Sequence, residues 1–85
     1  MTGEQLLRHA ASIVRDRRQA YGDPEDLFAR VAVRWSQVLG TALTPAQVAL
    51  CLIDLKLARL AHYPAHLDSQ LDLAGYAACL REVTR

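Results

Sequence analysis

The chain has 85 residues, of which 52% are hydrophobic and 22% are charged, and its net charge at pH 7 is +1. A chain of this length forms one domain and buries roughly 60–65% of the surface of its unfolded state. We therefore predict a single domain over residues 1–85, with marginal stability unless subunits associate. The near-neutral charge excludes a nucleic-acid polymer held by bulk electrostatic attraction, so we expect no such partner.

The sequence also bears on compartment and on cysteine chemistry. No apolar run reaches the roughly 18 residues that a membrane span needs, and the first residues lack a basic region followed by an apolar stretch. We expect a cytoplasmic protein that does not enter a membrane.

Cys51 and Cys79 lie in apolar helical patterns without CxxC spacing, which predicts buried, reduced thiols rather than a disulfide or a zinc site. A Tyr-Pro break separates His62 from His66, so we interpret both histidines as loop residues.

Start and stop signals predict four helices and no strand, hence an all-α fold in which the helices form a compact bundle. Thr2 and Gln5 form a capping box, and the apolar stripe that follows runs to about residue 20. The second helix begins at residues 23–24 and carries apolar residues along one side until Gly40 ends it.

The third and fourth helices are apolar almost all round. We expect the third to run from Thr44 to about His62, and the fourth from residues 68–69 to the C-terminus. Charged residues are rare between 48 and 61 and between 71 and 80. Four short helices cannot cover two such helices within one small domain, so the sequence predicts that another copy of the chain completes the bundle in a homo-oligomer.

The junction between the first two helices is a candidate ligand corner. Gly22 can adopt the left-handed conformation that ends a helix, Asp23 can accept from the free N–H groups of the next turn, and Pro24 fits a first helical position. Tyr21 places an aromatic ring close to three basic residues, Arg15, Arg17 and Arg18. Turn chemistry alone also accounts for the Gly, Asp and Pro residues, so that interpretation stays open.

The few charges in the two apolar helices are the main chemical signal. Lys56 and Arg59 are three residues apart and share one helix face. One face of the last helix carries the polar residues Asp68, Asp72, Tyr76 and Cys79. If the two helices form an antiparallel hairpin, the cations can meet the carboxylates. Isolated charges are costly to bury, so such residues are usually paired or functional.

This charged cluster has two interpretations. It is either a salt-bridge cluster that fixes the register of the hairpin, or part of a ligand pocket that also contains Arg17, Tyr21 and Asp23. Arginine, lysine and tyrosine side chains together suit the phosphate and the planar base of a small nucleotide. In such a pocket Asp68 and Asp72 can contact ribose hydroxyls or a base amine, or they can bind a magnesium ion.

An ordered set of motifs extends over nearly the whole chain from Arg17 onward. It comprises Tyr21-Gly22-Asp23-Pro24 with Phe28, then Trp35, Lys56-Leu57-Ala58-Arg59-Leu60, Asp68-Ser69 and Asp72-Leu73-Ala74-Gly75-Tyr76-Ala77. This set resembles a group of short, poorly characterised phage and prophage proteins, which implies a location in the host cell cytoplasm. Those proteins look loosely similar to the all-helical MazG-like nucleotide pyrophosphohydrolases, which use magnesium held by acidic residues on neighbouring helices.

The sequence departs from the MazG-like enzymes at the residues that would hold the metal. Those enzymes carry a Glu-Glu-x-x-Glu motif on one helix and a Glu-x-x-Asp motif on another, and this chain has neither. Asp68 and Asp72 could replace only the second motif, and the positive charge of Lys56 would weaken a metal cage. The pattern therefore favours binding over hydrolysis.

We accordingly expect a phage-type protein that binds a small nucleotide and sequesters a nucleotide signal of host defence without cleaving it. One alternative is a MazG-like, magnesium-dependent nucleoside triphosphate pyrophosphohydrolase in which Asp68 and Asp72 hold the metal. Another is a helical protein-interaction module in which the charged cluster provides specificity and no nucleotide binds.

Overall fold

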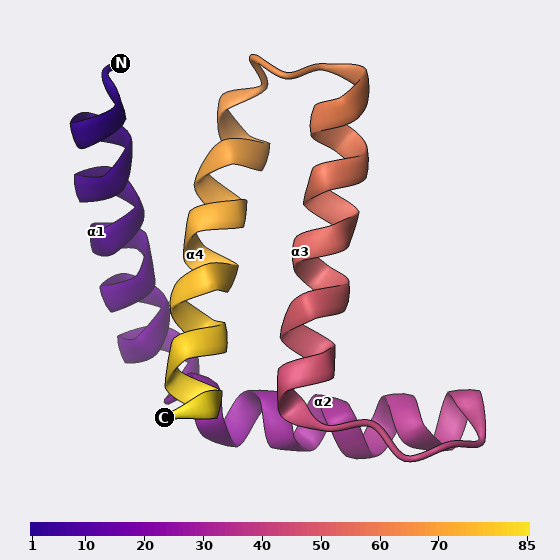
Figure 1. Cartoon of the computed structure of the whole chain (residues 1–85). Helices are drawn as coiled ribbons and strands as arrows, with labels where there is room; N and C mark the ends of the chain where they lie inside the picture. The colour runs from indigo at the N-terminus through magenta and orange to yellow at the C-terminus, as the bar shows by residue number, and fades with distance from the viewer.

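A computed structural model describes all residues, 1–85, and contains four helices and no strand. The helices are α1 (Gly3–Tyr21), α2 (Pro24–Leu39), α3 (Pro45–His62) and α4 (Leu67–Thr84). Figure 1 shows α1, α4 and α3 side by side with α4 in the middle, while α2 crosses the layer at the end where the chain terminates. The predicted all-α fold of four helices is confirmed.

Two capping boxes fix the starts of α1 and α3, as the sequence predicts. The Thr2 hydroxyl accepts a hydrogen bond from the Gln5 backbone N–H at 3.2 Å, and the Gln5 side chain accepts one from the Thr2 N–H at 2.9 Å. Thr44 and Gln47 repeat the arrangement at 3.1 and 2.9 Å. Each box pairs two N–H groups that would otherwise lack a partner at a helix start. Because both partners lie within four residues, these two helix starts can be predicted from the sequence.

The junction between α1 and α2 differs in part from the prediction. Gly22 ends α1 with a positive φ of +85°, which favours glycine, but its ψ of −174° differs from the left-handed helical conformation that Gly40 adopts. The Gly22 N–H donates to the Arg18 carbonyl at 2.9 Å. The Asp23 side chain, however, makes no capping hydrogen bond. Its backbone carbonyl accepts from the N–H groups of Asp26 and Leu27 instead. The Asp23 carboxylate instead forms an ion pair with the Arg18 guanidinium, at 3.5 Å. The guanidinium thus competes with the backbone N–H groups of α2 for this carboxylate.

The turn between α3 and α4 corrects the interpretation of one histidine. His62 is the last residue of α3 rather than a loop residue, whereas His66 lies in the connection, as predicted, directly before α4. The His66 ring lies 2.8 Å from the hydroxyl of Ser69, which is buried in the first turn of α4. This contact lets α4 begin at Leu67, slightly before the predicted start.

The hydrophobic core lies where α2 meets α3. Phe28 and Ala32 of α2 pack with Val48 and Ala49 of α3, and Tyr76 and other partly buried residues of α4 pack against this cluster. Only eight of the 85 residues are buried, so the core is small for a chain that is half hydrophobic. The structure therefore leaves much apolar surface uncovered.

The uncovered apolar residues gather on α2 and α3. They include Val33, Val38 and Leu39 of α2 and Leu50, Leu55 and Leu57 of α3. Cys51 is also exposed, so the prediction of a buried thiol is wrong at this position, because it lies on a side of α3 that no other helix covers. None of the four helices combines the length and apolar character needed to cross a bilayer.

Candidate functional site

A cavity of about 320 Å³ lies among the four helices. All four contribute to its wall, and 12 of its 18 lining residues are hydrophobic. The apolar and aromatic part of the lining includes Ile13, Val14, Tyr21, Leu27, Phe28, Val31, Trp35, Leu52, Leu71 and Tyr76. Ligand cavities in proteins span about 300–1,000 Å³ and combine mostly apolar walls with a few polar groups, so this cavity has the size and composition of a site for a small ligand.

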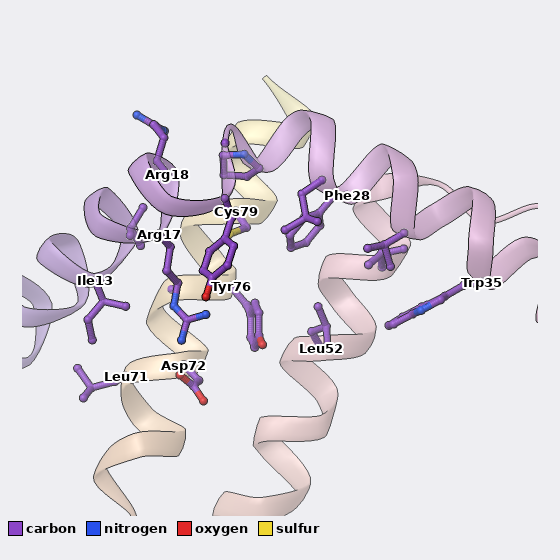
Figure 2. Close-up of a pocket in the computed structure, with 18 residues that line it drawn as sticks. Ile13, Arg17, Arg18, Phe28, Trp35, Leu52, Leu71, Asp72, Tyr76 and Cys79 are labelled. Carbon is purple, nitrogen blue, oxygen red and sulfur yellow. The ribbon is translucent and has the colours of Figure 1, made fainter.

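Arg17 is the cation that the cavity leaves without a carboxylate partner. Figure 2 shows its side chain extending from α1 into the space above Asp72 and Tyr76 of α4. Arg17 forms no ion pair. A guanidinium group beside apolar walls and without a carboxylate partner is an attractive contact for an anionic ligand.

Arg18, the next residue, is already neutralised. Its guanidinium lies 3.5 Å from the Asp23 carboxylate and 3.4 Å from that of Glu82. Although Arg18 lines the cavity, Figure 2 shows its tip directed away from Asp72. Its ion pairs connect α1 to α4 and to the junction before α2, which indicates a structural role.

Asp72 and Lys56 form a tight ion pair across the α3–α4 hairpin. The Lys56 ammonium lies 2.9 Å from a carboxylate oxygen of Asp72, and the two side chains are 10% and 36% exposed. Lys56 is one of the few buried polar residues of the chain. Because an unpaired charge at such a position is costly, the ion pair offsets the burial of Lys56 and joins the two helices. The predicted meeting of cation and carboxylate is thus found for Lys56.

The structure brings together some of the predicted site residues and separates others. Arg17, Tyr21, Asp72 and Tyr76 all line the cavity, and Lys56 contacts it through Asp72. Their roles in ligand binding stay predictions.

Three predicted site residues lie outside this group. Asp23 is tied to Arg18, although its neighbours Gly22 and Pro24 line the cavity. Asp68 is exposed and lines neither this cavity nor the hollow beside Arg59. Arg59 is exposed in the last turn of α3, where it lines a second, shallow hollow, and it forms no ion pair.

The hollow beside Arg59 is shallow and open to solvent. Its volume is about 460 Å³, and its walls are Ala58, Arg59, His62, Tyr63 and His66. The rings of Tyr63 and His66 are 5.7 Å apart and inclined at 41°. With few apolar walls, this hollow offers a ligand little area to bury.

The chain contains no group of three or more His, Cys, Asp or Glu side chains placed to hold a metal ion. Asp68 and Asp72 therefore lack a third protein ligand, and Asp72 is already paired with Lys56. A magnesium site at these two residues stays a prediction that requires further ligands from water, from phosphate oxygens or from another chain.

Cys79 lines the cavity, although the sequence analysis did not include it among the ligand-binding residues. That analysis did place Cys79 on the same face of the last helix as Asp72 and Tyr76. It follows Asp72 and Tyr76 at helical spacing on α4, and this spacing was the available signal. Burial raises the pKa of the Cys79 thiol above its ordinary value of 9.0; Arg17 and Arg18 oppose the shift and Glu82 adds to it. The side chain is consequently a neutral thiol near pH 7 and a poor nucleophile.

The fold and the cavity define a small all-helical domain with one mainly apolar, ligand-sized cavity. The chain belongs to the family described as a domain of unknown function, DUF6378, whose sequence model matches residues 5–84. The expected membership of an uncharacterised family with phage representatives is confirmed.

Two curated relatives come from mycobacteriophages. The Gene 55 protein of Mycobacterium phage L5 is 36% identical over 80 residues, which cover 92% of this chain and 51% of the relative. The Gene 55 protein of Mycobacterium phage D29 is 32% identical over 81 residues, covering 94% and 54%. The chain thus spans about half the length of these relatives. No solved structure matches it.

Proposed function

We propose that this protein binds a small nucleotide in the cavity among its four helices and does not cleave it. The observation that carries the proposal is the combination of apolar walls, two tyrosines and the unpaired Arg17 in one cavity of about 320 Å³. Guanidinium groups bind phosphate oxygens through paired hydrogen bonds, and aromatic side chains accept a planar base against their faces. The cavity volume suits a nucleotide-sized ligand.

A sequestering role is consistent with the family and with the residues of the cavity. The relatives from two mycobacteriophages support a phage-type protein. The proposal adds that this protein acts in the host cytoplasm, where it withholds a nucleotide signal of host defence. Asp72, the acidic group in the cavity wall, is engaged by Lys56 and is therefore a poor metal ligand or general base. Binding without cleavage requires neither.

We also propose that the protein acts as a homo-oligomer. Leu50 and Leu57 are seven residues apart on α3, so they share a helix face, and both are about half exposed. Uncovered apolar side chains of this kind are stabilised when a second copy of the chain covers them.

The first test is a ligand panel. Purified protein is titrated by calorimetry with nucleoside mono-, di- and triphosphates and with cyclic nucleotides, with and without magnesium, and each bound nucleotide is recovered and chromatographed. A nucleotide that binds and is recovered intact supports sequestration. Recovery of a cleaved product would instead support the MazG-like pyrophosphohydrolase, and no binding at all would favour the protein-interaction module.

A matched pair of variants locates the site. Arg17→Ala should weaken nucleotide binding about ten- to hundredfold, because a hydrogen bond to a charged group contributes about 1.5–3 kcal/mol. Arg59→Ala removes an equally unpaired arginine outside the cavity and should change the affinity less than about twofold. Equal losses in the two variants would place the nucleotide elsewhere.

A further inference from the structure

The charges around the cavity are arranged so that one cation is left over. Arg17, Arg18 and Asp72 line the cavity, and Lys56 contacts Asp72 from behind. We infer that Lys56 acts as the counter-ion that keeps Asp72 from neutralising Arg17, so that the cavity selects a ligand with a single phosphate group. This inference rests on the proposed function and specifies its ligand.

The position of Asp72 makes this counter-ion necessary. The Arg17 side chain extends toward Asp72 in Figure 2, yet the two residues form no ion pair. The carboxylate of Asp72 pairs instead with the Lys56 ammonium at 2.9 Å. Lys56 is buried, and Asp72 is the only carboxylate with which it pairs, so the Asp72 charge is held on the α3 side of α4. Arg17 remains available to a ligand.

The balance of charge determines how many phosphate groups fit. Arg18 is paired with Asp23 and with Glu82, which also pairs with Arg85, and Lys56 is paired with Asp72. Arg17 is therefore the one cation in the cavity wall without a carboxylate partner. A monophosphate or a phosphodiester can place its phosphate on Arg17 and its base against the apolar walls. A triphosphate would bring two further anionic groups next to those walls without a cation to pair them, and unpaired charges are costly in such surroundings.

The first experiment compares three ligands that differ only in phosphate number. Affinities of one nucleoside mono-, di- and triphosphate are measured by calorimetry in metal-free buffer. The monophosphate should bind at least about tenfold more tightly than the triphosphate. Equal or tighter binding of the triphosphate would overturn the inference while leaving nucleotide binding intact. Failure of every nucleotide in the wider panel to bind would mean that the proposed function itself is wrong.

The second experiment tests the counter-ion role of Lys56. Lys56→Met should weaken binding of the tightest monophosphate or cyclic nucleotide about tenfold, because the freed Asp72 can then pair with Arg17. Adding Asp72→Asn to that variant removes the competing carboxylate and should restore about tenfold of affinity relative to Lys56→Met alone. If Lys56 served only the fold, the second substitution would restore nothing. Circular dichroism confirms that each variant is folded.

A single variant keeps the test decisive if Lys56→Met fails to fold. Asp72→Asn retains the Lys56 ammonium and adds its charge to that of Arg17. The ratio of triphosphate to monophosphate affinity should therefore rise about tenfold relative to the wild type. An unchanged ratio would show that the Lys56–Asp72 pair does not set the charge of the cavity.

Discussion

The two sides of α3 are similar in sequence but lie in opposite environments. On the inner side Val48 is fully buried, and Lys56 is buried despite its charge. On the outer side Leu50 and Leu57 are 52% and 49% exposed. An apolar helix therefore does not reveal which of its sides faces the core: here α2 and α4 cover the side that carries a lysine and leave the leucines in contact with solvent.

The two sides of α3 are therefore suited to different roles, the inner side to ligand binding and the outer side to association between chains. The inner side belongs to the core and the cavity, where Val48 and Leu52 contribute to the wall. The outer side is unpartnered within the chain and is available to a second copy. Substitutions on the inner side should therefore change stability and ligand binding, and those on the outer side should change association.

The largest effect is expected in the core that the inner side of α3 helps to form. Phe28 packs against Val48 and Ala49, so Phe28→Ala should lower the free energy of unfolding by about 3–5 kcal/mol. Leu57→Ala on the outer side should cost less than about 1 kcal/mol in the isolated subunit, because its side chain is already half exposed. Denaturant unfolding at a low protein concentration measures both values, and similar losses would contradict the difference between the two sides.

A smaller effect is expected on self-association. Replacing Leu50 and Leu57 together by Gln should weaken the oligomer at least about tenfold, since burial of one leucine side chain contributes about 1.5–3 kcal/mol. Sedimentation velocity over a range of concentrations measures the change. Circular dichroism of the variant should match that of the wild type. A wild-type protein that stays monomeric at high concentration would refute the proposed homo-oligomer.

The smallest effect concerns the two thiols. Cys51 is exposed on α3, whereas burial keeps the pKa of Cys79 above 9.0. A disulfide reagent should therefore modify Cys51 first at pH 8, and a bound nucleotide should protect Cys79 alone. The Cys79 thiol ionises at a lower pH in the unfolded chain than in the folded one. The free energy of unfolding should therefore fall as the pH rises above 9.0. Cys79→Ala should remove that part of the pH dependence, and faster modification of Cys79 than of Cys51 would contradict the burial.

Much of the fold was predictable because its boundaries depend on local interactions. The two capping boxes and the glycines Gly22 and Gly40 act within a few residues, and all four signals mark helix boundaries in the structure, as the sequence predicts. Asp23 was predicted wrongly because its carboxylate has two possible partners. The adjacent N–H groups are visible in the sequence, but the geometry of Arg18 is not.

Local sequence patterns were sufficient to predict the helices, the apolar character of α3 and α4, and the residue types from which a ligand site could be built. They could not predict that Lys56 meets Asp72, that Arg17 is left without a carboxylate or that Arg59 lies outside the cavity. The reason is geometric. Helical periodicity fixes which residues share a face, whereas ion pairing depends on how far each helix slides and rotates against its neighbour, and that is set by packing along the whole contact.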